Sequence, residues 1–169
     1  KRQRSSHDER IVLNDRHTIQ LMRASGYRKN RSLARIQYLW DEARAFTRCA
    51  SKAPSPDIIL VSMPSPVVCR AVLDYAEPLG IPVVIDVRDL WPDIFVDMVP
   101  RVFAPLMRLA LRTTSRANQT IFEQATAITA ISEQYLNWGL VHAGRNRMET
   151  DRVFPHVYSA PSVSPTDRR

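Results

Sequence analysis

The feature that most constrains the fold is an alternation of short apolar runs with helical segments from residue 57 onward. Residues 57–62, 82–87 and 125–131 are short runs in which apolar and β-branched side chains follow one another almost without interruption. Such runs are typical of strands buried on both faces of a sheet. Residues 67–79, between the first two runs, have a helical pattern. This order predicts an α/β fold with a Rossmann-like parallel sheet and helices on both faces.

Weaker signals extend this order at both ends. A short apolar run at 10–13 predicts a strand, a long helical pattern covers 32–50, and 152–155 predicts a last short strand. The first of these strands is weak and follows a polar stretch, so we expect the opening strand–helix unit of the sheet to be missing. The expected organisation is a basic polar tail at 1–9, an incomplete Rossmann-like domain at 10–158 and a linker at 159–169.

The charge of the chain is concentrated at its start. The 169 residues have a net charge of +7, and residues 1–35 contain ten basic and three acidic side chains, which is the whole excess. A basic stretch of this kind can contact nucleic acid, an anionic lipid surface or a phosphorylated substrate, or it can be a solvated loop. Nucleic-acid binding is disfavoured, because Tyr27 is the only aromatic side chain in the stretch that could stack on a base.

The sequence predicts no metal and no membrane span, and no cofactor is expected. Hydrophobic residues make up 44% of the chain, which suffices for one core, but no apolar stretch reaches the ~20 residues that a transmembrane helix requires. Cys49 and Cys69, the two cysteines, are expected to be reduced thiols in a cytosolic protein. The histidines lack the spacing of metal ligands. They are His7, His17, His142 and His156.

The segments that follow the predicted strands are the candidates for a functional site. In an open α/β sheet, ligands bind beyond the carboxyl ends of the strands. Three such segments stand at 62–66, 88–93 and 132–133. We therefore predict that the strand ends at Ser62, Val87 and Ile131 lie on one edge of the sheet.

The segment after the second buried strand carries the most chemistry. Arg88 is a permanent cation with five donors, which suits a phosphate or a leaving group that gains negative charge. Asp89 can accept hydrogen bonds from sugar hydroxyls, and Trp91 offers a flat apolar face that can stack on a sugar ring or a lipid chain. In a purely structural alternative, Asp89 caps the next turn and Trp91 lies in the core. Arg88 then pairs with Asp86 or Asp93.

Three stretches of the sequence resemble a known family. Residues 56–66, 80–92 and 127–133 are similar to the N-terminal domain of family-four glycosyltransferases, in the branch that builds bacterial capsules, exopolysaccharides and O-antigens. The most specific piece is the strand followed by Val-Arg-Asp-Leu-Trp-Pro at 87–92. A loop at 26–30 and the helix after it also fit, and the resemblance covers about 10–158.

The resemblance implies one half of a GT-B enzyme, which has two Rossmann-like domains and transfers a sugar with retention of configuration and without a catalytic metal. The first domain of such enzymes holds the acceptor, and the second binds the nucleotide sugar. We therefore expect a hexosyltransferase of cell-surface polysaccharide synthesis whose partners are a nucleotide-sugar donor and a saccharide or polyprenyl-phosphate-linked acceptor. The nucleotide sugar is a substrate bound mainly by the other domain, so this chain alone is expected to be nearly inactive.

The resemblance also implies roles for individual residues. Arg88 and Asp89 are expected to be catalytic. The residues expected to contact the acceptor are Ser65, Trp91, Ser132 and Glu133. This sequence departs from the family in three respects: many relatives carry His at the position of Arg88, and neither the opening strand with its Gly-rich loop nor the second domain with its paired glutamates is in this chain.

Residues 100–121 predict a basic amphipathic helix. At about 100° per residue, an apolar set clusters on one side and four arginines on the other. The apolar set is Phe103, Leu106, Met107, Ala110, Ala117 and Ile121, and the basic set is Arg101, Arg108, Arg112 and Arg116. The helix could pack its apolar side on the sheet and solvate its arginines. Alternatively, the arginines and the basic start face an anionic bilayer that holds a polyprenyl-phosphate acceptor, on the inner side of the plasma membrane.

A different class of protein also fits the pattern of strands and helices. A flavodoxin-like binding or regulatory domain without catalytic chemistry would have a sheet complete in itself. It would also bind a small ligand tightly with this chain alone, which distinguishes it from half of a transferase.

Overall fold

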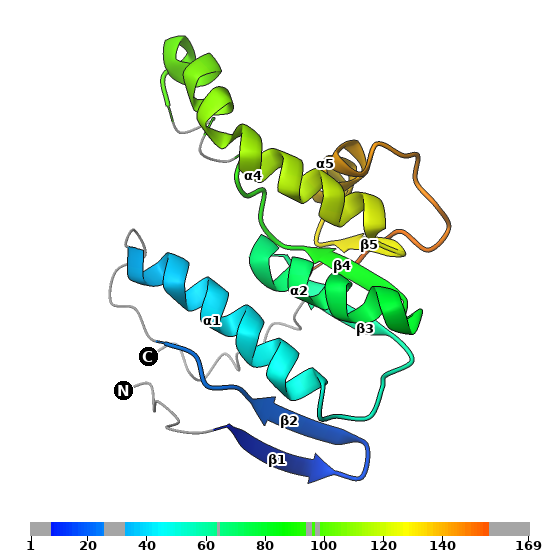
Figure 1. The fold of residues 1–169 in the computed structure, drawn as a ribbon. Coiled ribbons are helices and arrows are strands. Elements are labelled where there is room, and N and C mark those ends of the chain that lie inside the picture. Colours follow the sequence, from blue (N-terminus) through cyan, green and yellow to red (C-terminus); the bar gives the residue numbers. More distant parts are fainter. Residues whose placement is uncertain (1–7, 26–32, 64, 94–95, 97–98, 156–169) are drawn as a thin grey trace, which may run out of the picture.

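The computed structural model describes residues 8–25, 33–63, 65–93, 96 and 99–155 (Figure 1). Its elements in chain order are β1 (Glu9–Asn14), β2 (His17–Leu21), α1 (Leu33–Ala50), β3 (Ile59–Ser62), α2 (Pro66–Ala76), η1 (Glu77–Leu79), β4 (Val83–Val87), η2 (Arg101–Phe103), α4 (Ala104–Gln124), β5 (Ala127–Ala130), α5 (Glu133–Ala143) and β6 (Arg152–Val153). The expected tail at 1–7, the loop at 26–30 and the linker at 159–169 lie outside the described residues.

A four-stranded parallel sheet is the centre of the fold, as predicted. Its strands are in the order β3-β4-β5-β6, so each strand pairs with the next one in the chain. The connections α2, α4 and α5 therefore all run in the same direction across the sheet, and right-handed connections of this kind lie on one face. Helices on both faces were expected, but the connecting helices that the structure describes cover one face only.

Side chains alternate between the two faces of the sheet. Val61, Ile85 and Ile128 are neighbours across three strands, and all three belong to the core that the helices cover. That core also contains Val72 of α2, Phe122 of α4 and Leu136 of α5. The next row along the strands faces the other way and is polar, with Ser62, Asp86 and Thr129 side by side. The polar row belongs to the site described below.

Helix α5 packs very closely on the sheet because it has a glycine at the contact. A Cβ atom on Gly139 would stand 3.1 Å from Cγ2 of Ile128 and 3.3 Å from Cγ2 of Val87. Either separation is shorter than an ordinary van der Waals contact, so a larger side chain at this position would require the side chains of Ile128 and Val87 to shift. This close contact fixes the helix that begins just after β5, at the edge where the predicted site lies.

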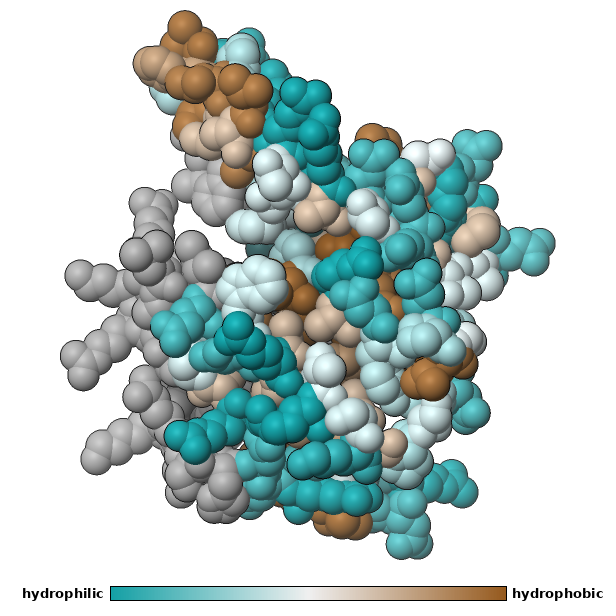
Figure 2. Space-filling model, in the orientation of Figure 1, coloured by the Kyte–Doolittle hydropathy of each residue, from teal (hydrophilic) through white to brown (hydrophobic). Residues whose placement is uncertain are grey.

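Helix α4 is amphipathic, as predicted, but a different side of it packs on the protein. Its buried residues are Ala104, Asn118, Ile121 and Phe122. Of the predicted apolar set, Ile121 is buried and Met107 is half-buried, whereas Phe103, Leu106, Ala110 and Ala117 are exposed. The first half of the helix projects from the body of the molecule (Figure 1), and an apolar group lies on its surface there (Figure 2).

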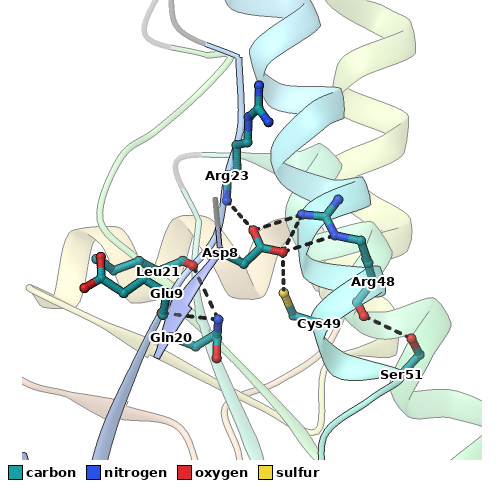
Figure 3. A network of polar contacts seen from close by, with 8 residues as sticks. All are labelled: Asp8, Glu9, Gln20, Leu21, Arg23, Arg48, Cys49 and Ser51. Carbon is teal, nitrogen blue, oxygen red and sulfur yellow. Dashed lines mark hydrogen bonds and ion pairs between the residues drawn. The ribbon is translucent and has the colours of Figure 1, made fainter. Parts of the chain in front are cut away.

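The N-terminal strands form a separate hairpin rather than an edge of the parallel sheet. The predicted strand at 10–13 is confirmed as β1, but it pairs with β2 in an antiparallel manner. The carboxylate of Asp8 connects this hairpin to α1 (Figure 3): it accepts hydrogen bonds from the backbone N–H of Arg23 at 2.7 Å and from the guanidinium of Arg48 at 3.0 Å. These two donors lower the pKa of Asp8.

A buried carboxylate fixes the last strand. Asp151 is fully buried, receives two hydrogen bonds from Arg145 at 2.6 and 2.9 Å, and accepts from the backbone N–H groups of Ile128 and Met148, each at 2.8 Å. Burial opposes ionisation of this carboxyl, but the four hydrogen bonds outweigh it and lower its pKa. The ionised form of Asp151 therefore links β5 to the loop before β6.

Candidate functional site

The carboxyl ends of the central strands lie on one edge of the sheet, as predicted. Ser62 at the end of β3 pairs with Asp86, and Val87 at the end of β4 pairs with Ala130 at the end of β5. Ala130 in turn pairs with Val153 of β6. The segments that follow these strands, including Arg88 to Asp93, therefore begin along the same edge.

Arg88 forms an ion pair with the carboxylate of Asp86 at this edge. Its Nε donates to Oδ2 of Asp86 at 2.5 Å, while the hydroxyls of Thr129 and Ser62 donate to the same carboxylate at 3.0 and 3.5 Å. Asp86 is buried, whereas the side chain of Arg88 is 51% exposed. The pairing that the structural alternative proposed is thus present. It uses only the Nε end of the guanidinium.

The outer end of Arg88 remains available to a ligand. The Nη groups of Arg88 form no hydrogen bond with any residue that the structure describes. A guanidinium held by its Nε and open at its two Nη atoms presents two parallel donors, which is the geometry that binds a phosphate or a carboxylate in a bidentate manner. The ion pair with Asp86 therefore orients Arg88 without using up its anion-binding end.

Asp89 is half-buried and its carboxylate is free within the described part of the chain. No hydrogen bond or ion pair joins it to a described residue, so the predicted alternative, in which Asp89 caps the next turn, is not what is found. A carboxylate without such a partner can accept a hydrogen bond from a hydroxyl of a ligand. Arg88 and Asp89 together offer one donor pair and one acceptor.

The segment after Asp89 is held in place by hydrogen bonds from residues of two helices. The side-chain amide of Asn118 in α4, which is fully buried, donates to the carbonyl oxygen of Trp91 at 2.7 Å. The indole N–H of Trp138 in α5 donates to the carboxylate of Asp93 at 2.8 Å. Asp93 is therefore the partner of Trp138 rather than of Arg88, and Trp91 is half-buried rather than fully in the core.

Sequence reasoning missed Asn118 and Trp138 as supports of the site. Asn118 lies on the same helical stripe as Ile121 and Phe122, one turn before them, where the pattern favours an apolar side chain. The polar side chain of Asn118 on an otherwise apolar stripe is the feature that could have identified it as a support of the site, because a buried amide must find a hydrogen-bonding partner. Trp138 additionally packs edge-on against Phe122, with ring centroids 5.5 Å apart.

The three remaining predicted site residues have structural partners. Ser65 and Ser132 cap the N-termini of α2 and α5, where their hydroxyls accept from the backbone N–H groups of Val68 and Tyr135, each at 3.4 Å. Glu133 pairs with Arg147 at 2.9 Å and is exposed. Both helix N-termini follow strands of the sheet, so their backbone N–H groups stand at the same edge as Arg88 and favour a negatively charged ligand there.

The arrangement offers donors to an anion and an acceptor to a hydroxyl. Among the described residues there is no group of three or more His, Cys, Asp or Glu side chains that could hold a metal ion. A search of the described residues also finds no helix long and apolar enough to cross a membrane. Comparisons with models of protein families, with curated proteins and with solved structures found no match to this chain.

Proposed function

We propose that this chain is the acceptor-side half of a retaining GT-B glycosyltransferase, which transfers a hexosyl group from a nucleotide sugar to a lipid-linked saccharide in the synthesis of a cell-surface polysaccharide. The proposal rests on the resemblance of 56–66, 80–92 and 127–133 to family-four enzymes. The observation that carries it is Arg88 at the carboxyl edge of the sheet, whose Nε contacts Asp86 while its Nη groups form no hydrogen bond with a described residue; Asp89 is the next residue in the chain, and its carboxylate also has no partner among the described residues.

The proposed chemistry assigns a separate task to each of these side chains. During transfer, the bond from C1 of the sugar to the nucleoside diphosphate breaks and a bond from C1 to the acceptor oxygen forms. The nucleoside diphosphate departs with the electron pair and takes up the proton that the acceptor hydroxyl loses. Arg88 stabilises the negative charge that grows on the diphosphate. Asp89 accepts a hydrogen bond from an acceptor hydroxyl and orients it, and Trp91 lies beside a sugar ring or lipid chain.

The exposed edge of the sheet supports a fold that continues beyond the described strands. Strand β3 is an outer strand of the sheet, and Leu60 within it is 66% exposed. An apolar outer strand without protective charges or Pro is a site for pairing with a further strand. We propose that an opening strand–helix unit of the complete enzyme pairs with β3.

A titration of this chain with nucleotide sugars separates the proposal from a flavodoxin-like binding domain. Because the nucleotide pocket belongs to the second domain of the proposed enzyme, calorimetry with UDP- and GDP-sugars should detect no binding by the 169-residue chain. Binding with a micromolar Kd, about −8 kcal/mol, would contradict the proposal. It would favour a domain that binds a small ligand by itself.

A further inference from the structure

The first half of α4 and the η2 turn before it carry a second apolar surface that does not face the protein. At about 100° per residue, the side chains of this segment fall into three stripes about 120° apart. One is the buried stripe that ends in Asn118 and Phe122. A second, here called the apolar stripe, consists of Val102, Phe103, Leu106 and Leu109. The third, the basic stripe, consists of Arg101, Arg108, Arg112 and Arg116.

The apolar stripe is open to solvent over most of its area. Val102 is 77% exposed, Leu106 67% and Leu109 64%, and Phe103 is also exposed. Figure 2 shows this hydrophobic group at the projecting end of α4. Isolated apolar side chains on a surface are ordinary, but four in one stripe on a projecting helix mark a surface that another body covers.

The charge around the apolar stripe identifies what covers it. Between residues 100 and 122 the sequence contains four arginines and no acidic residue. None of the four arginines forms an ion pair with a residue that the structure describes. An apolar stripe flanked by arginines, in a stretch from 100 to 122 that has no acidic residue, matches the surface of an anionic bilayer, which offers acyl chains below a layer of phosphate groups.

We propose that residues 101–112 dock on an anionic phospholipid surface. The apolar stripe enters the boundary between headgroups and acyl chains. The arginine side chains reach along the surface to lipid phosphates, since their long apolar stems allow the charged ends to stay among the headgroups. The projection of this half of α4 from the rest of the molecule (Figure 1) lets the stripe reach a flat surface before the sheet does.

This inference stands on α4 alone and is independent of the proposed sugar transfer. The same helix would nevertheless link a docked membrane to the site, because Asn118 in its second half donates a hydrogen bond to the carbonyl of Trp91. A protein docked through the first half of α4 would keep Arg88 and Asp89 at a fixed height above the lipid surface.

Vesicle flotation with the 169-residue chain tests the proposal. The probe is a set of vesicles of phosphatidylcholine with about one third phosphatidylglycerol, compared with vesicles of phosphatidylcholine alone. Wild-type protein should float with the anionic vesicles and remain below with the neutral ones. The double variant Leu106→Ser/Leu109→Ser should bind at least tenfold more weakly, and so should Arg108→Gln/Arg112→Gln. All of these side chains are exposed, so the variants should melt like the wild type.

The matched controls are Val141→Ser and Arg44→Gln. Val141 is an exposed apolar residue on α5, and Arg44 is an exposed arginine on α1, so each change removes the same kind of side chain elsewhere. Both controls should float like the wild type. Any attraction of the basic N-terminal stretch to anionic lipid would not depend on Leu106 or Leu109, so loss of binding in the leucine variant is specific to the apolar stripe.

Three results would overturn the proposal. One is absence of binding to anionic vesicles by the wild type. Another is equal binding by wild type and the leucine variant, which would assign the attraction to basic residues elsewhere. The third is a dimer, detected by sedimentation, that the leucine variant abolishes while vesicle binding stays unchanged, because the apolar stripe would then contact a second copy of this chain.

Discussion

The exchange of Arg88 for Lys separates the role proposed for this residue from a purely structural one. Lysine keeps the positive charge but replaces the planar guanidinium by a single ammonium, which cannot donate to Asp86 and to a ligand in the same forked geometry. In the structure, only the Nε of Arg88 contacts Asp86, and the side chain is 51% exposed. The substitution therefore weakens a half-exposed ion pair and removes the forked donors proposed to act on the diphosphate.

The two roles predict effects of different size. A half-exposed ion pair contributes at most about 1 kcal/mol, which in a domain of this length shifts Tm by about 2–4 °C. The carboxylate of Asp86 would still receive hydrogen bonds from Thr129 and Ser62. Loss of one preorganised donor to a developing charge typically costs about 10²-fold or more in kcat. Turnover should therefore fall by about two orders of magnitude while the fold is nearly unchanged.

The assay measures initial rates of sugar transfer from a labelled nucleotide sugar by the intact enzyme, with a thermal melt of each variant. Arg44→Lys is the matched control, since Arg44 is an exposed arginine that pairs with Asp41 at 3.4 Å; it should leave both rate and Tm unchanged. If Arg88→Lys keeps full turnover but melts several degrees lower, the ion pair with Asp86 is the whole role of Arg88. The catalytic assignment would then be wrong.

Three further changes follow from the contacts of individual residues. Asp89→Asn should lower transfer to the acceptor more than hydrolysis of the donor, with an unchanged Tm because the carboxylate has no hydrogen bond to a described residue; equal losses in both reactions would argue against acceptor binding. Asn118→Ala should destabilise the fold by about 2 kcal/mol, because it removes the hydrogen bond from Asn118 to the carbonyl of Trp91. It should also lower kcat. Chemical unfolding curves that match the wild type would refute the structural role of Asn118. Because the folded-state pKa of Asp151 is lowered, its stabilising effect is present above its unfolded-state pKa and is lost as the pH falls through the folded value. Asp151→Asn should therefore lower the free energy of unfolding by about 3 kcal/mol at pH 7. In this variant the free energy of unfolding should fall less steeply below about pH 4 than in the wild type. Equal pH profiles of variant and wild type would contradict the role of Asp151.

The strands of the parallel sheet could be predicted from the sequence because each is a short apolar run in a chain that is otherwise mixed. Residues 82–87 were expected as a strand, and β4 runs from Val83 to Val87. The hairpin partner β2 was not predicted, because its five residues are all exposed and include His17 and Gln20 among apolar ones. The side chain of Asn14 stabilises the turn between β1 and β2, because it accepts a hydrogen bond from the backbone N–H of Arg16 at 2.9 Å. The residue that marks this turn in the sequence is therefore an Asn and not a Gly.

Helix α4 shows where periodicity stops being informative. The 3.6-residue repeat located the helix correctly, but this helix has two apolar sides. Leu106 and Ile121 both satisfy the repeat when one broad stripe is drawn, and only contact with the rest of the protein determines that Ile121 is buried and Leu106 is not. A sequence pattern alone cannot distinguish a side that packs on the core from a second apolar side that remains open.

The site was predicted in its position and less fully in its contacts. Strand ends of a parallel sheet meet at one edge whatever the side chains are, so the position of Arg88 and Asp89 followed from the order of strands. The pairing of Arg88 with Asp86 was foreseen as an alternative, because residues two apart in a strand lie on the same face. Asn118 could not be foreseen as a partner of Trp91, since it is distant in the chain and bonds to a backbone carbonyl.

Sugar transfer by the proposed enzyme, of which this chain would be one half, is the most direct test of the proposed function. A panel of labelled nucleotide sugars would be incubated with the enzyme and lipid-linked saccharide acceptors, and label in the lipid fraction would be measured together with the anomeric configuration of the product. We predict transfer from at least one nucleotide sugar, with the configuration of the donor retained and no requirement for a divalent metal. Transfer with inverted configuration, or no transfer above the enzyme-free background from any donor in the panel, would contradict the account.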